Sequence, residues 1–198
     1  MKKLIALIAA AVAAPAFAAT TYDIDASHSA TSFAVKHLVV STVRGQFDKT
    51  TGAIQYDEAN PARSTVDATV DAASIDTRDP KRDEHLRSAD FFDVAKYPTL
   101  SFRSTSVATA GKDKLEVKGD LTLHGVTRPV TLAVSATPAV KGMYGETRRA
   151  FSATTTIHRK DFGLTWNKAV EAGPVVGDDV IITLDIEGVE RKPQTAAR

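Results

Sequence analysis

The chain of 198 residues carries 25 basic and 24 acidic side chains. This near-balance argues against a nucleic-acid partner, because phosphate binding shows itself as a basic excess or stripe. The chain contains no cysteine, so disulfides are excluded and a well-filled core must provide the stability.

The first 18 residues are predicted to be a secretory signal peptide. Lys2 and Lys3 precede a short apolar run, and Ala16-Phe17-Ala18 supplies the small-x-small pattern of a cleavage site. Without these two lysines the chain holds 23 basic and 24 acidic residues, a formal charge of −1. No later segment approaches the roughly 20 apolar residues of a transmembrane helix. We expect a soluble chain exported to the periplasm, with one domain over residues 19–191 and a polar tail over 192–198.

The stretch from Ser27 to Phe47 is the first predicted strand region. In an extended chain Phe33, Val35 and His37 fall on one face. The dipeptide Arg44-Gly45 is interpreted as the turn that ends this run. Such a strand either holds an apolar molecule and grips its polar end, or is an ordinary core strand with solvated ends.

Strict alternation of apolar and polar residues continues along the rest of the chain. One apolar and one wet face, repeated this often, predict an antiparallel sheet. Exposed edges are a liability in such a sheet, and closure into a barrel removes them, although a two-sheet sandwich fits the same periodicity. The alternating segments are residues 65–72, 100–103, 115–124, 130–134, 151–157 and 180–187.

Turn residues predict the connections between strands. Asp48 to Gly52 is predicted to form a hairpin between strands 43–47 and 53–57, and further turns are expected at Ala110 to Asp113 and at His124-Gly125. The segment 163–177, which holds Trp166, lacks alternation and is predicted to be a loop with one helical turn near the barrel end.

A short helical segment is predicted near residues 79–93. Asp79 suits an N-cap, Pro80 the first helical position, and residues 81–87 are good helix formers. A second helical turn is expected at residues 88–92, before Pro98. The apolar side of this segment covers the mouth of a barrel or packs on the outer sheet.

The inward faces include small residues, which leave two alternatives open: a hollow barrel that holds one ligand, or a core filled by opposing Phe and Leu side chains. These small residues are Ala68, Ala72, Ser104, Gly119, Ala153 and Thr155.

Catalytic and metal signatures are weak. The sequence has no G-x-S-x-G elbow, P-loop or H-E-x-x-H motif, and its five histidines are too scattered to predict metal ligation. His124 is interpreted as a turn residue and Asp161 as a cap for backbone N–H groups. We therefore predict neither catalytic residues nor a metal site.

Five motifs in order, covering Thr20 to Val189, resemble the YceI-like family. They are Asp25-x-x-His28-Ser29 with Phe33-x-Val35-Lys36-His37-Leu38 and Val43-Arg44-Gly45-x-Phe47; His85 to Val94 with Tyr97-Pro98; Gly119-x-Leu121 through Val130; Arg159-x-Asp161-Phe162-Gly163-Leu164; and Val176-Gly177-Asp178-Asp179-Val180.

The resemblance implies an all-β, lipocalin-like fold, an extended eight-stranded antiparallel barrel around a hydrophobic tunnel. It also implies an exported, non-enzymatic protein that carries a polyisoprenoid, such as an isoprenoid quinone or prenyl pyrophosphate, or a similar long-chain amphiphile. The lipid would bind non-covalently, with no other cofactor, and a homodimer would follow from an open sheet edge or a flat apolar patch. Two alternatives remain: an enzyme that uses His28 or His158 with Asp161 on an amphiphilic substrate, and a ligand-free, stress-induced structural protein.

Candidate ligand-binding residues follow from the motifs. The predicted apolar lining comprises Phe33, Val35, Phe47, Phe91, Phe92, Phe102, Leu121, Phe151 and Phe162. The predicted polar mouth, where a carbonyl or pyrophosphate would meet donors, comprises His28, His37, Arg44, His158, Arg159 and Trp166.

Overall fold

The structure is a computed structural model that describes residues 19–170 and 173–192. The predicted signal peptide, residues 1–18, and residues 193–198 of the predicted tail lie outside the described residues. In the part of the chain that the structure describes, no helix has the length and apolar character needed to cross a membrane.

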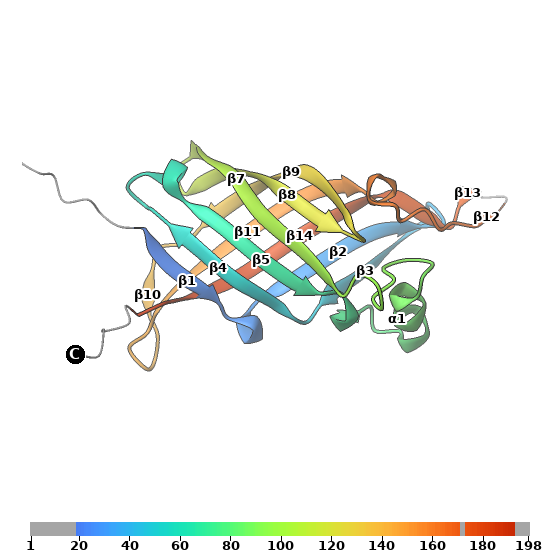
Figure 1. The fold of residues 1–198 in the computed structure, drawn as a ribbon, viewed down its shortest axis with the longest axis horizontal. Helices are drawn as coiled ribbons and strands as arrows, with labels where there is room; N and C mark the ends of the chain where they lie inside the picture. Colours follow the sequence, from blue (N-terminus) through green and yellow to red (C-terminus); the bar gives the residue numbers. More distant parts are fainter. Residues whose placement is uncertain (1–18, 171–172, 193–198) are drawn as a thin grey trace, which may run out of the picture.

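Eight strands close into an antiparallel barrel in the order β1–β4–β5–β7–β8–β9–β11–β14 (Figure 1). The last strand closes the ring, because β14 pairs with β11 along one edge and with β1 along the other. The predicted barrel is thereby confirmed, and the sandwich alternative is not. The strands of the ring are β1 Thr20–Ile24, β4 Thr50–Tyr56, β5 Thr65–Asp71, β7 Thr99–Gly111, β8 Lys114–Leu123, β9 Val126–Ala136, β11 Thr147–His158 and β14 Val176–Glu190.

Three further strands lengthen the barrel at one end. β2 (Ala30–His37) continues β1 along the edge of β14, after the 3-10 turn η1 (Ala26–His28). β3 (Ser41–Phe47) pairs with β2, and β6 (Ile75–Asp76), which follows the 3-10 turn η3 (Ala72–Ser74), pairs with β3. These pairs give the barrel its elongated form.

The hairpin predicted at Asp48 to Gly52 is wrong. β3 and β4 run in the same direction, since both are antiparallel to the continuous line of β1 and β2. Asp48 and Lys49 only interrupt one long strand, and their N–H groups bond Ser74 of the neighbouring η3 at 3.1 and 3.2 Å. The chain instead reverses between β2 and β3, after His37.

The turn predicted at Arg44-Gly45 is also wrong, because both residues lie inside β3. Gly45 is needed there for packing: a Cβ at this position would lie 2.5 Å from the ring of Phe33 on β2. The other predicted hairpins are confirmed. At the β8–β9 turn His124 and Gly125 have φ of 52° and 73°, the left-handed pair of a tight hairpin.

The predicted helix is confirmed as α1 (Pro80–Arg87), whose N-cap Asp79 accepts hydrogen bonds from the N–H groups of Lys81 and Arg82. Residues 88–92 form irregular turns, so the second helical turn is wrong. The buried carboxylate of Asp83 accepts bonds from the N–H and hydroxyl of Thr77 at 2.9 and 2.6 Å. This bond holds α1 against the chain that leaves β6, at one end of the barrel (Figure 1).

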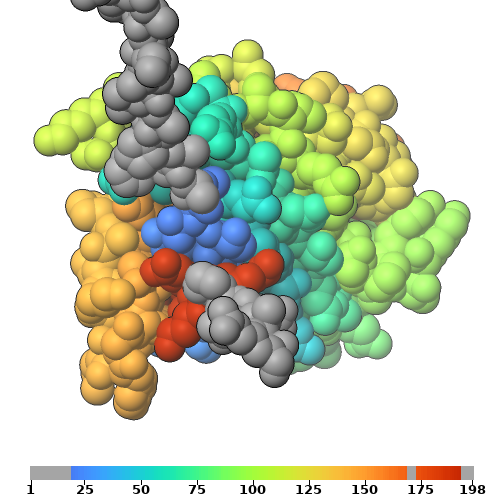
Figure 2. Space-filling view, turned by 60° about the vertical axis from the view of Figure 1, so that its left-hand side comes forward, coloured from blue at the N-terminus to red at the C-terminus, as the bar shows by residue number. Residues whose placement is uncertain are grey.

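The segment 163–177 contains no helical turn among its described residues. It follows η4 (Arg159–Phe162) and includes the short strands β12 (Ala169–Val170) and β13 (Gly173–Pro174), at the same end as α1 (Figure 1). β10 (Val140–Lys141) pairs with the start of β11 at the opposite end, where β1 and the end of β14 also lie (Figure 2).

Candidate functional site

An apolar cavity of about 210 Å³ lies inside the barrel. Its wall is built from the inward-facing side chains of the strands, because alternate residues of a strand point to opposite faces. β14 illustrates this rule: Val180, Ile182, Leu184 and Ile186 line the cavity, whereas Ile181, Thr183 and Asp185 are exposed. The hollow alternative of the sequence analysis therefore holds.

Only some of the small inward-facing residues predicted from the sequence border the cavity. Ala68 and Thr155 line the cavity. Gly119 instead admits the ring of Phe102, since a Cβ there would collide with that ring and with the carbonyl oxygen of Arg103.

Most of the predicted apolar lining does face the cavity. Leu86, which the predicted lining did not include, joins Phe91 and Phe92 in covering the α1 end. The predicted residues in the wall are Phe33, Val35, Phe47, Phe91, Phe92, Phe102, Leu121 and, from the predicted polar mouth, Arg159.

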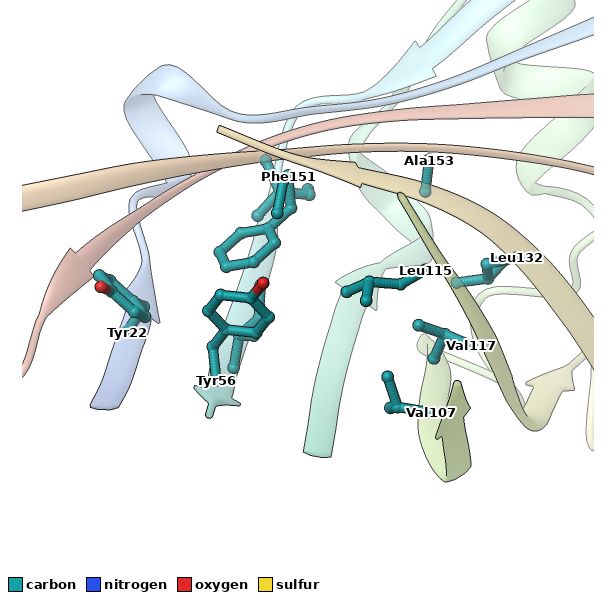
Figure 3. Packing of buried hydrophobic residues seen from close by; sticks show 11 residues of the cluster. Tyr22, Tyr56, Val107, Leu115, Val117, Leu132, Phe151 and Ala153 are labelled. Carbon is teal, nitrogen blue, oxygen red and sulfur yellow. The ribbon is translucent and has the colours of Figure 1, made fainter. Parts of the chain in front are cut away.

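Two predicted lining residues do not reach the cavity. Phe151 packs with Tyr22 and Tyr56, with ring centroids 6.1 and 5.6 Å apart, in the core at the end of the barrel away from α1 (Figure 3). Phe162 is buried in η4 and packs with Leu164. Both side chains are buried, as their positions in the sequence pattern predict. Periodicity shows which side chains point into a barrel, but it does not show where along the barrel axis the interior is filled and where it is hollow.

The aromatic end also contains a buried cation. Arg149 lies over the ring of Tyr56 at 4.7 Å and donates a hydrogen bond to Glu58 at 2.8 Å. Burial raises the pKa of Tyr22 and of Tyr56, so both hydroxyls stay neutral. The cavity is closed at this end by a packed aromatic layer.

Arg159 is buried, but its donors are occupied. Its guanidinium bonds the backbone carbonyls of Gly177 at 2.9 Å, Trp166 at 2.9 Å, Leu164 and Val176, and pairs with Asp178 at 3.2 Å. Burial lowers its pKa, although not enough to neutralise a guanidinium. Arg159 thus ties η4 to the start of β14 at the α1 end.

The other residues of the predicted mouth lie outside the cavity wall. His158 pairs with Asp179 at 2.6 Å on the outer face, and Arg44 is exposed on β3. His37 is the last residue of β2. The ring of Trp166 packs edge-on against that of His85, with centroids 4.9 Å apart, and its centroid lies 5.0 Å from that of Phe91. Trp166 therefore packs behind the side chains that cover the α1 end of the cavity.

His28 lies in η1, in a network on the outside of the barrel. Its Nδ1 lies 2.9 Å from Asp25, and Arg148 bonds Asp25, Glu146 and Glu187. Bonds from Ser27 and His28, with Arg148, hold the pKa of Asp25 well below its ordinary value. Ligand atoms of Asp25, His28 and Glu187 lie within 4.8 Å of one another, but Arg148 already bonds both carboxylates.

Several lining residues outside the predicted lining carry a usable signal in the sequence. Residues 180–187 alternate between apolar and polar, and their apolar face forms part of the cavity wall. Thr31 and Thr50, which also line the wall, bond each other at 2.9 Å, and no local pattern pairs residues on β2 and β4.

Comparison with known proteins agrees with this architecture. A family model, that of the YceI-like domain, matches residues 22–188. The chain belongs to the YceI-like family. It is 41% identical over 194 residues to a UPF0312 protein of Vibrio cholerae, covering 96% of this chain and 99% of the relative. It is 40% identical over 176 residues to Protein YceI of Escherichia coli O157:H7, covering 88% and 89%.

Solved structures of other proteins share the barrel. Burkholderia cenocepacia BcnA superposes with a TM-score of 0.75 at 27% identity, covering 83% of this chain and 99% of BcnA. A polyisoprenoid binding domain from Saccharophagus degradans superposes with a TM-score of 0.62 at 19% identity, covering 86% and 98%, which is a likeness of fold alone.

Proposed function

We propose that the protein is a periplasmic carrier that sequesters the tail of a polyisoprenoid, or of a similar long-chain amphiphile, inside the barrel. The observation that carries this proposal is the cavity inside the barrel with its apolar wall. A tail that enters it gains about 0.8 kcal/mol for each CH₂ group removed from water. The similar fold of a polyisoprenoid binding domain supports the same class of ligand.

The head group belongs outside the apolar wall. Among the described lining residues, Thr31 and Thr50 bond each other and Arg159 bonds backbone carbonyls, so a quinone carbonyl or a pyrophosphate would meet few free donors. Burying such groups without partners costs several kcal/mol. Van der Waals contact and apolar burial therefore provide the affinity, and the head group sets the orientation.

The α1 end is the proposed entrance. There Leu86, Phe91 and Phe92 cover the cavity from short segments, whereas strands and a packed aromatic layer close the rest. A cavity of about 210 Å³ exceeds the roughly 150 Å³ that admits benzene but is smaller than a typical ligand pocket of about 300–1,000 Å³. A long tail must therefore displace some of these covering side chains.

The direct test is mass spectrometry of organic extracts from protein purified from its own periplasm. We expect a stoichiometric isoprenoid lipid, and repeated recovery of empty protein would contradict the proposal. Thr155→Trp should fill the cavity and abolish lipid recovery. Thr156→Trp, on the exposed face of the same strand, is the matched control and should retain the lipid.

Export is tested separately, by the mass of the purified chain and by cell fractionation. We expect residues 1–18 to be removed and the protein to be found in the periplasmic fraction. A cytoplasmic chain that retains these residues would contradict export without touching the lipid.

The enzymatic alternative has no supporting geometry. The alternative pairs either histidine with Asp161, but the ring of His28 bonds Asp25 at 2.9 Å and that of His158 bonds Asp179 at 2.6 Å. Neither histidine nor Asp161 is among the residues that line the cavity. A ligand-free structural protein would need no hollow at all.

A further inference from the structure

The turn between β2 and β3 exposes two branched apolar side chains to water. Val39 is 64% exposed and Val40 is 82% exposed, at the tip that follows His37. Polar residues and glycine are the usual choice for such a turn. Exposed large apolar residues beside a ligand entrance are candidates for contact with another apolar phase.

The backbone of this tip is strained as well. Leu38 and Val39 adopt φ of 50° and 65°, and a β-branched residue in the left-handed region is an outlier. Asparagine or glycine at Val39 would relieve the strain and the exposure together. The apolar turn therefore costs stability that a purely structural role does not explain.

The tip lies next to the proposed entrance. His37 pairs with Val176, which lines the cavity together with Val35, and the N–H of Leu38 bonds the carbonyl of Val175 at 3.0 Å. Figure 1 shows this turn at the same end of the barrel as α1, beside β12 and β13.

The hairpin that presents the tip is basic. Lys36 and Arg44 are exposed on the same outer face, and residues 30–47 contain no Asp or Glu. Neither cation forms an ion pair with any other residue that the structure describes. The nearby acids on β14 already have partners: Asp178 pairs with Arg159 and Lys160, and Asp179 pairs with His158.

We propose that the β2–β3 tip is a membrane-contact element, which inserts Val39 and Val40 into the interface of an anionic bilayer while Lys36 and Arg44 meet lipid phosphates. The inference rests on the proposed carrier function, since it positions the entrance against the membrane that supplies the tail. A bilayer fits this surface better than a second copy of the chain, because a three-residue tip is far smaller than the roughly 800 Å² per partner of a stable protein interface.

The test is flotation of the purified full chain with vesicles of phosphatidylethanolamine and phosphatidylglycerol. We expect the double variant Val39→Asn/Val40→Ser to lose binding while its thermal stability is equal to or higher than that of the wild type. The matched control is Met143→Ser/Tyr144→Ser, which removes two side chains, 90% and 89% exposed, from the opposite end and should bind normally. Equal loss in both variants would overturn the proposal in favour of unspecific adhesion.

The charge contribution is tested with Lys36→Gln and Arg44→Gln. Each should weaken binding to the anionic vesicles about fivefold, and neither should matter on phosphatidylcholine vesicles. Self-association of the wild type, abolished by Val39→Asn/Val40→Ser without any vesicle binding, would assign the tip to a second copy and overturn the proposal.

Loading experiments separate this inference from the carrier function. With ubiquinone as the probe, Val39→Asn/Val40→Ser should load normally from detergent micelles but at least severalfold more slowly than wild type from vesicles. Equal rates from vesicles would overturn the membrane contact alone. Failure of the wild type to load from micelles would overturn the carrier function, whereas flotation would still report on the tip.

Discussion

Arg159 shows how a residue with the chemistry of a ligand site can serve the fold. Its sequence context suggests a free guanidinium at a polar mouth. The structure instead directs the donors to backbone carbonyls of two segments, and the nearest carboxylate belongs to Asp178. Such bonds depend on how a loop and a distant strand meet, which no local motif reveals.

Replacement of Arg159 should therefore destabilise the barrel. Arg159→Met leaves the buried backbone carbonyls without this donor and leaves Asp178 with Lys160 as its remaining partner, and we expect a loss of about 3–5 kcal/mol in the free energy of unfolding. Urea denaturation measures it. Lys160→Met, which removes an exposed partner of the same Asp178, should cost less than about 1 kcal/mol. Equal losses in the two variants would contradict the role of Arg159 in tying η4 to the start of β14.

The η1 network should make stability depend on pH. Hydrogen bonds from Ser27, His28 and Arg148 lower the pKa of Asp25 in the folded chain, so its stabilisation is present above the ordinary value near pH 4 and is lost as the pH falls below it. Asp25→Ala should cost about 2–3 kcal/mol at pH 7 and progressively less toward pH 2. Urea midpoints at several pH values check this. Asp185→Ala, on an exposed site of β14, is the control, and a pH-independent difference would refute the assignment.

At the scale of elements, α1 is attached by polar bonds rather than by an extensive apolar face. Arg87 donates to the carbonyls of Ala73 and Ile75 at 2.8 and 2.6 Å, and the carboxylate of Asp83 is buried. Asp83 accepts both bonds that Thr77 donates, and Thr77 in turn accepts a bond from Arg82 at 2.7 Å. The helix that covers the proposed entrance is thus attached by a small set of polar bonds, which can break without unfolding the barrel.

Asp83→Ala should loosen α1 alone. We expect faster amide hydrogen exchange over residues 80–92 and a loss of about 1–3 kcal/mol in local stability, because two buried donors of Thr77 lose their acceptor. Exchange in β8 and β9 should be unchanged. Glu84→Ala, exposed on the same helix, should behave like the wild type, and uniform acceleration across the barrel would contradict local attachment.

Strands and helices are predicted correctly where neighbouring residues carry the signal. The prediction is wrong where the structure depends on which distant strands pair. Alternation identified β5, β7, β8, β9, β11 and β14, and the Asp79-Pro80 signature identified α1. Asp48 to Gly52 was misassigned because the same residue types that make a turn also interrupt a strand; the bonds to Ser74, 25 and more residues away, distinguish the two. Leu38 and Val39 were missed as the real turn because neither is a turn former.

For the whole molecule, a ligand that binds the closed barrel must stabilise it by mass action. At a hundredfold excess over the dissociation constant the gain is about 2.7 kcal/mol. For a domain of this size it raises the melting temperature by roughly 5–11 °C. Calorimetry of delipidated and ubiquinone-loaded protein tests this, and Thr155→Trp should show no shift. If the melting temperature of the wild type is the same with and without ubiquinone, binding inside the barrel is refuted.

Closure of the ring by β14 has a consequence for the order of events during synthesis. Until residues 176–190 are available, β11 and the joined β1 and β2 have unpaired edges, and the hollow does not exist. If the chain crosses a membrane unfolded, the barrel closes only after its C-terminal strand has been translocated. The ligand would then bind after translocation, and it could not be carried inside the barrel from the compartment in which the chain is synthesised.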